Sequence, residues 1–267
     1  MSVATRPAGV GDLLREWRQR RRLSQMDLSN EAEVSARHLS FVETGRSKPS
    51  RELLLHLAEH LDVPLRDRNG MLLAAGYAPV YRETSLDAET MGPVRSALDK
   101  ILTSHQPYPA VIVDRRWDLV SANDAALGIL TEDVDPALLQ PPVNAMRVSL
   151  HPDGLAKRIR NFDEYSAHLI TRLHRQAAMA GDDKLDQLLA ELKDYPNVSE
   201  ASTLAVEPAD LLFAPLIITS RGRQLTFFST LATFGTALDI TMAELAIESF
   251  YPGDAETAEA LRQVATP

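Results

Sequence analysis

The sequence predicts two domains: an all-α domain of five short helices over residues 1–82, followed by an α+β domain with a mainly antiparallel sheet over residues 83–267. Three observations lead to this prediction. Apolar residues recur at helical spacing between cap and stop signals as far as Pro79. Runs rich in β-branched residues are confined to the later part of the chain. The net charge of −9 divides into +3 for residues 1–82 (13 Lys and Arg, 10 Asp and Glu) and −12 for the remainder.

Each helix of the first domain has its own start or stop signal. An apolar stripe of Leu13, Leu14, Trp17 and Leu23 predicts the first helix, and arginines crowd its end, where cations complement the helix dipole. The expected N-caps of the second, third and fourth helices are Ser24, Ser35 and Ser50. Gly45 is expected to end the third helix in a left-handed conformation, and Pro64 is expected to open the fifth.

The second part of the chain mixes helix and strand signals. The polar residues 81–96 indicate a linker, which overlaps the start of a helix expected from about Pro93 to Ser104. Two β-branched runs around Asp114-Arg115-Arg116 predict a hairpin, residues 123–130 a helix, and Pro141-Pro142 a loop. Two longer helices are predicted over residues 153–180 and 182–195. Residues 210–252 are strand-rich, with turns expected at Ser220–Arg223 and Phe234–Thr236.

The third helix has the pattern of a DNA-recognition helix. Leu39 and Val42 form a stripe to bury, whereas Ala36, Arg37, His38 and Ser40 remain available outside it. A short turn, Glu33-Val34, joins it to the second helix, as in a helix-turn-helix whose second helix enters the major groove. An arginine binds guanine through two hydrogen bonds, and alanine is small enough to meet a thymine methyl group. The residues expected to contact phosphates are Gln25, Arg46, Lys48, Ser50 and Arg51. The alternative is a helical bundle whose polar face only meets solvent.

The segment "LSQMDLSNEAEVSARHLSFVETGRSKPSRELLLHLAEHLDV" resembles the lambda-repressor-like, or XRE-type, DNA-binding domains, and the similarity extends from Gly11 to Gly76. The resemblance implies that Gln25 contacts a phosphate and that Ser35, Ala36, Arg37 and Ser40 face the groove. The chain departs from the family at Glu33, where a glycine is usual. A left-handed backbone at Glu33 would cost about 1 kcal/mol.

Four further segments, "RHLSFVETGRSKPS", "LLLAAGYAPVY", "PPVNAMRVSLHPDGL" and "TFFSTLATFGTALDITMAELAIESFYPGD", make nearly the whole chain similar to the MmyB-like subfamily of these regulators. The resemblance implies a PAS-like C-terminal sensor that holds a small apolar ligand such as a fatty acid. Apolar and aromatic residues in excess of what sheet pairing needs are the candidate lining: Val111, Val113, Trp117, Phe162, Tyr165, Leu169, Phe227 and Phe234. Arg147 and His151 are candidate anchors for a carboxylate. The same residues would serve equally as core packing and as hydrogen-bond donors to loop carbonyls.

Motifs for catalysis and metal binding are weak. The chain has no cysteine, and no Gly-x-Ser-x-Gly, phosphate-loop or dinucleotide fingerprint occurs, so no catalytic residue, metal or cofactor is predicted other than the apolar ligand. His56 to His60 matches a His-x-x-Glu-His pattern, but these histidines fall on the solvent face of the fourth helix. His168 and His174 are six residues apart and so lie on different sides of a helix.

The expected function is a ligand-responsive transcription regulator that binds operator DNA as a homodimer. The chain shows neither a signal segment nor a run of about 18 apolar residues, which predicts a cytoplasmic protein without a membrane partner. In that location the Asn197-Val198-Ser199 sequon has no role. Two alternatives remain open at this point: a second domain that only dimerises without a ligand, and an enzyme that carries a DNA-binding head.

Overall fold

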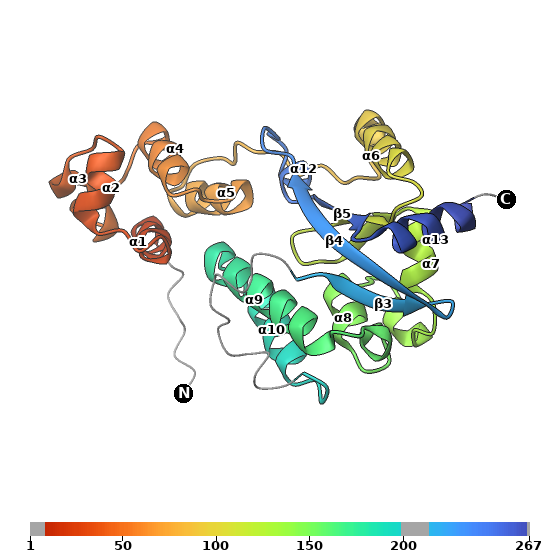
Figure 1. Ribbon diagram of the computed structural model, residues 1–267. Helices are drawn as coiled ribbons and strands as arrows, with labels where there is room; N and C mark the ends of the chain where they lie inside the picture. Colours follow the sequence, from red (N-terminus) through yellow and green to blue (C-terminus); the bar gives the residue numbers. More distant parts are fainter. Residues whose placement is uncertain (1–8, 199–213, 266–267) are drawn as a thin grey trace. The chain divides into compact units, whose positions relative to one another are not determined.

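The chain divides into two compact units in the computed structural model, which describes residues 9–198 and 214–265 (Figure 1). The N-terminal unit contains the residues up to Thr84 together with Thr236–Ala243, and the C-terminal unit contains Ser85–Gly235 and the residues from Glu244 onward. The division expected after Arg82 falls two residues before the observed one. A short segment from late in the chain, Thr236–Ala243, also belongs to the N-terminal unit.

The N-terminal unit is helical, and its first five helices are those that the sequence predicts. They are α1 Val10–Arg20, α2 Gln25–Glu31, α3 Ala36–Glu43, α4 Arg51–His60 and α5 Leu65–Ala74. Ser24, Ser35 and Ser50 accept the backbone N–H groups of the third residue on, which confirms the three predicted caps. The apolar residues of these helices form one buried core, which includes Leu14, Trp17, Leu28, Leu39, Val42, Leu54, Leu57 and Leu61.

Backbone conformation at two positions and one close approach between helices constrain residues of this unit. Gly45 has a φ of +71° and Glu33 a φ of +51°, so the left-handed conformation expected at both positions is present. At Glu33 it carries the steric penalty that a glycine would avoid. A Cβ atom at Gly11 would lie 2.4 Å from the backbone oxygen of Val42, so only a glycine lets α1 approach the end of α3.

The late segment of the N-terminal unit contains one short helix, α12 Ile240–Ala243, which packs against α5. The Thr84 hydroxyl donates to Asp239 Oδ2 at 2.6 Å, and the Ile240 N–H donates to the Arg82 carbonyl at 2.8 Å. These bonds join the end of the helical domain to residues more than 150 positions later in the chain.

The C-terminal unit is built on a five-stranded antiparallel sheet in the order β2-β1-β5-β4-β3. The strands are β1 Ala110–Val113, β2 Leu119–Ala122, β3 Leu216–Ser220, β4 Arg223–Thr233 and β5 Ala246–Pro252. The predicted turns at Asp114–Arg116 and Ser220–Arg223 join β1 to β2 and β3 to β4. The fold class, a five-helix domain followed by an α+β domain with an antiparallel sheet, is therefore confirmed.

Helices and short 3-10 turns supply the rest of this unit. They are α6 Gly92–Ser104, α7 Asp124–Leu130, α8 Ala145–Leu150, α9 Phe162–Ala180, α10 Asp183–Lys193 and α13 Ala255–Ala265, with 3-10 turns at Glu89–Met91, Pro136–Leu139 and Ala156–Arg158. Residues of α7, α8, α9, α10 and α13 join residues of β1, β3 and β4 in one buried core.

The predicted helix over residues 153–180 is wrong in its first part, because α9 begins only at Phe162. The backbone of Ile159 pairs with Ile218, and the Arg160 N–H donates to the Ile217 carbonyl at 2.7 Å. This pairing with β3 holds Ile159 extended after the 3-10 turn Ala156–Arg158 and overrides the helical propensity of the segment. Of the strand-rich stretch expected from residue 210, residues 210–213 lie outside the described residues, as does Ser199 of the sequon.

Candidate nucleic-acid interface and ligand site

The outer side of α3 consists of the residues that the sequence singled out. Ser35 and Arg37 are exposed, Ala36, His38 and Ser40 are half-buried, and Leu39 and Val42 are buried in the core. The Arg37 guanidinium lies 5.4 Å from the centroid of the Phe41 ring, one turn further along the helix. This contact orients the side chain while its N–H groups remain available for a guanine.

The residues that follow α3 form an exposed, positively charged flank of Arg46, Lys48, Ser50 and Arg51. Lys48 Nζ lies 4.7 Å from the centroid of the Tyr77 ring, and the Tyr77 hydroxyl donates to the Pro49 carbonyl at 2.9 Å. The Ser50 hydroxyl oxygen accepts from the Leu53 N–H at 3.1 Å as the cap of α4. Its own proton therefore remains free to bind a phosphate oxygen.

A buried ion pair stands behind this surface. Arg18 on α1 donates to both carboxylate oxygens of Glu43 at 2.7 and 2.8 Å, and the Gln25 amide donates to Glu43 Oε2 at 2.7 Å. The Glu43 side chain is fully buried. Burial opposes ionisation of this carboxyl, but the bonds from Arg18 and Gln25 and the charges of Arg18 and Arg15 outweigh it and lower its pKa. Glu43 thus fixes the amide of Gln25, whose nitrogen keeps a second N–H for a phosphate.

The C-terminal unit contains an apolar cavity of about 60 Å³ between the sheet and helices α7, α8 and α9. Its lining residues are Pro109, Val111, Trp117, Ala126, Ile129, Leu130, Ala145, Met146, Ser149, Leu155, Tyr165, Leu169, Leu216, Phe227, Glu248 and Phe250. Among these largely apolar residues, Ser149 and Tyr165 carry hydroxyl groups and Glu248 a carboxylate. An apolar hollow with a few polar groups is the usual form of a small-molecule site.

Comparison with known families matches one family model to each of two parts of the chain. A helix-turn-helix family model matches residues 10–69, and the model of the MmyB-like transcription regulator ligand binding domain matches residues 94–264. The chain belongs to the MmyB-like transcription regulators. Both modules are those of regulators rather than of enzymes. A DNA-binding transcription regulator with a ligand-binding domain is thus the function class that these matches establish.

Other comparisons add little to the family assignment. The PAS domain of Bordetella pertussis BvgS matches at 16% identity and a TM-score of 0.24, with 64% of this chain and 95% of that chain covered. An RNA-binding light-oxygen-voltage receptor matches at 13% identity and a TM-score of 0.30, with 98% and 64% covered. TM-scores this low carry no argument about function. The curated proteins contain no significant match.

In this MmyB-like regulator, five of the eight residues predicted to line the ligand site do line the cavity: Val111, Trp117, Tyr165, Leu169 and Phe227. Val113 is in the neighbouring core, and Phe162 packs at its edge. Phe234 lies in the turn after β4 and is not among the lining residues.

The two predicted carboxylate anchors do not line the cavity either. Arg147 donates to both carboxylate oxygens of Glu191 at 2.7 Å, and His151 Nδ1 accepts from the Asp153 N–H at 3.1 Å. The side chain of Arg147 is held by an acidic partner on α10, which no sequence spacing indicates. The structure thus assigns both residues contacts with the protein itself.

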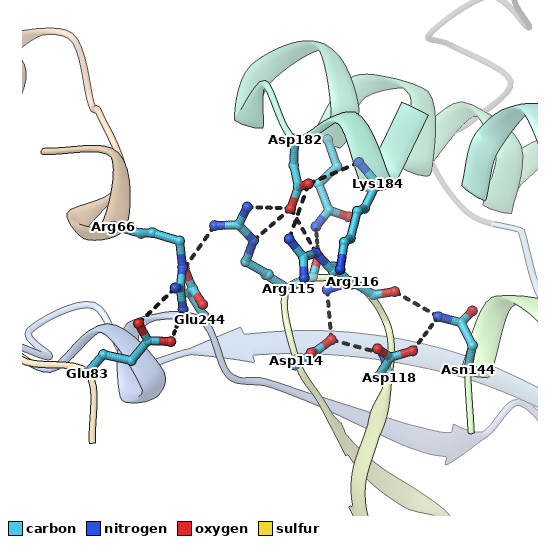
Figure 2. Close-up of polar contacts among 11 residues, drawn as sticks. Arg66, Glu83, Asp114, Arg115, Arg116, Asp118, Asn144, Asp182, Lys184 and Glu244 are labelled. Atoms are coloured by element: carbon cyan, nitrogen blue, oxygen red, sulfur yellow. Dashed lines mark hydrogen bonds and ion pairs between the residues drawn. The ribbon is translucent and has the colours of Figure 1, made fainter. Parts of the chain in front are cut away.

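A polar cluster at the β1–β2 turn positions Trp117 in the wall of the regulator's cavity. Asp182, the cap of α10, accepts hydrogen bonds from Arg115, Arg116 and the Lys184 N–H (Figure 2). The Trp117 indole N–H donates to Gln176 Oε1 at 2.7 Å, and the Gln176 amide donates to the Arg115 carbonyl at 2.7 Å. The turn, α9 and α10 are thereby joined behind the indole ring.

Two negative findings concern the described part of the regulator alone. None of its described helices is long and apolar enough to cross a membrane. Within the same residues, no group of three or more His, Asp or Glu side chains is placed to hold a metal ion. His56 and His60 are exposed, with ring centroids 4.6 Å apart, and His56 Nε2 contacts the Ala32 carbonyl at 2.8 Å.

Proposed function

We propose that this MmyB-like regulator binds operator DNA through α3 and its flank, and that an apolar small molecule in the cavity changes its operator affinity. The outward stripe of α3 carries the proposal, because short polar side chains, a base-reading arginine and phosphate-binding donors lie together there. The charges support it, since residues 1–82 have a net charge of +3 within a chain of −9. A protein that acts on an operator works in the cytoplasm, where the DNA is.

The proposed DNA-binding form is a homodimer. One recognition helix as short as α3, Ala36–Glu43, reaches few base pairs, so one copy discriminates poorly among sites. Two copies related by a two-fold axis read two half-sites about 34 to 36 Å apart and multiply the discrimination. The expected operator is therefore a palindrome or near-palindrome.

The proposed ligand is apolar, and a fatty acid is one candidate because its chain matches the lining. The cavity of about 60 Å³ is small beside the roughly 300 to 1,000 Å³ of drug-sized sites. A long chain would therefore need lining side chains to move apart. This requirement suits a regulator, because a ligand shifts a conformational equilibrium only when it binds one arrangement better than the other.

Selection of bound sequences from random double-stranded DNA, followed by fluorescence anisotropy, tests the proposal. We expect a two-fold symmetric sequence to be enriched, and we expect its affinity to change about fivefold or more between delipidated protein and protein loaded with an apolar ligand. Enrichment of no sequence would refute operator binding. An affinity that no loaded molecule changes would refute ligand control and leave a second domain that only dimerises.

Replacing either of two arginines of the N-terminal unit with alanine should weaken DNA binding, but in different ways. Replacement Arg37→Ala should cost about 1 to 3 kcal/mol of binding at the preferred operator and relax the preference at one base position in each half-site. Replacement Arg46→Ala should weaken preferred and unrelated sequences alike and lower the salt dependence of binding. Anisotropy titrations on an operator and its single-base variants measure both effects. Equal losses on all sequences for Arg37→Ala would remove it from base recognition.

A further inference from the structure

Glu248 places a carboxylate in the apolar cavity. It lies on β5, is 7% exposed and belongs to the lining. Arg172 donates to its Oε1 at 3.0 Å, and the Ser229 hydroxyl donates to the same oxygen at 2.9 Å. Among the residues that the structure describes, nothing donates a hydrogen bond to Oε2. This oxygen therefore keeps lone pairs that can accept a hydrogen bond from a molecule in the cavity.

Tyr165 contributes a second polar group without a partner. Tyr165 is 8% exposed and lines the same cavity, and its hydroxyl makes no hydrogen bond to any described part of the chain. Burial, together with the negative charge of Glu248, raises the pKa of the Tyr165 phenol well above its usual range. The group is therefore a neutral hydroxyl that can accept one hydrogen bond and donate another.

The charges around the cavity disfavour an ionic ligand. The Arg172 guanidinium pairs with Glu248 and lies 4.4 Å from the centroid of the Trp117 ring, so the charge of Glu248 is already balanced. A second carboxylate beside Glu248 would be repelled, and an ammonium group would meet a carboxylate that Arg172 has already neutralised. Either ion would also lose its hydration in an apolar space.

We propose that the cavity takes an apolar molecule that ends in a neutral hydroxyl group, which donates to Glu248 Oε2 and accepts from the Tyr165 hydroxyl. One hydroxyl can both donate to Glu248 and accept from Tyr165, whereas a carboxylate offers no proton to Glu248. This inference rests on the proposed function, since it assumes that the cavity holds a ligand. It narrows the ligand class from apolar molecules in general to alcohols, and it places an ionised fatty acid at a disadvantage.

Matched amphiphiles test the inference. Delipidated full-length protein is titrated at neutral pH with n-alkanols, n-alkanoates and n-alkylamines from hexyl to dodecyl, and heat or tryptophan fluorescence is followed. We expect the best alkanol to bind at least about tenfold more tightly than the alkanoate and the amine of equal length. An alkanoate that binds as tightly as the alkanol, or more tightly, would overturn the inference and leave ligand control standing. Binding of none of the three series would overturn both.

Two variants separate the polar contacts from the fold. Replacement Glu248→Gln removes the charge at nearly constant shape and should narrow the preference for alkanol over alkanoate to within about threefold. Replacement Tyr165→Phe should weaken the alkanol about tenfold and leave a plain alkane unaffected. Tyr251→Phe is the matched control, because Tyr251 lies on β5 outside the cavity and stacks on Phe228. Alkanol affinities that neither cavity variant changes would show that a water molecule, rather than the ligand, meets these groups.

Discussion

Replacing Glu43 with alanine is expected to remove about 3 to 5 kcal/mol of the folding free energy of the N-terminal unit. The Arg18 guanidinium, whose side chain is only 10% exposed, would lose both of its bonds to the carboxylate and remain buried with its charge. Gln25 would lose its partner at the same time. A small domain is stable by about 5 to 15 kcal/mol, so this loss would be a large part of its total stability.

Hydrogen exchange of the full-length protein measures this effect for each unit separately. Amides of α1 and α3 should lose protection in Glu43→Ala, whereas those of β1 and β5 should keep theirs. Glu59→Ala is the matched control, because Glu59 is exposed on α4 of the same unit. Protection in Glu43→Ala equal to that in Glu59→Ala would show that the ion pair adds nothing.

A double replacement separates the attraction within the pair from the penalty of an orphaned charge. Arg18→Met combined with Glu43→Leu removes both charges and fills the same space. We expect this variant to be more stable than Glu43→Ala, because a buried pair replaced by apolar groups is often neutral in stability. DNA binding should nevertheless weaken, since the Gln25 amide would no longer be held in place.

Local signals explain why the helices of the N-terminal unit are predictable and its ion pair is not. Caps at Ser24, Ser35 and Ser50 act within three residues, so the sequence shows them directly. Glu43 and Arg18 are 25 residues apart and meet only when α1 crosses α3. A signal exists nonetheless: Glu43 directly follows Val42 on the apolar stripe of α3, where an acidic residue needs a buried partner.

Prediction of the cavity from the sequence is limited in the same way. Aromatic and aliphatic lining residues are predictable as a class, since their number exceeds what strand pairing needs. Glu248 was missed, although it alternates with Ala246 and Phe250 on one side of β5 and so had to face inward with them. The inclusion of Thr236–Ala243 in the N-terminal unit has no local signal, because it depends on the meeting of Asp239 with Thr84.

Replacing Asp182 with asparagine is expected to cause the second large loss of stability, in this case in the C-terminal unit. Asp182 is 7% exposed and accepts hydrogen bonds from two guanidinium groups and a backbone N–H (Figure 2). Burial opposes its ionisation, but the bonds from Arg116 and Arg115 outweigh it and lower the pKa of Asp182 to about 2. Against an unfolded pKa of about 3.9, this difference corresponds to about 2 to 3 kcal/mol of stability at neutral pH, which Asp182→Asn should lose.

The sign of the pH dependence follows from the lowered pKa. A carboxyl group whose pKa falls on folding stabilises the folded state fully above its unfolded pKa, and this contribution disappears as the pH falls toward the folded pKa. The stability gap between the wild type and Asp182→Asn should therefore be constant above a pH of about 5 and should close between about 4 and 2. Arg115 also donates to Glu244 at 3.0 Å, so part of the cluster survives the replacement.

Urea unfolding followed by the fluorescence of Trp117 measures the gap, because this indole is joined to the cluster through Gln176 and Arg115. The chain has two tryptophans, so all variants also carry Trp17→Phe, and Trp117 is then the only fluorescent indole. Asp186→Asn, on the exposed side of α10, is the matched control and should show no gap at any pH. A gap for Asp182→Asn that persists unchanged down to a pH of about 2 would mean that the carboxylate's charge is not what holds Arg115 and Arg116. In that case the shape of the turn alone would position Trp117 in the cavity wall.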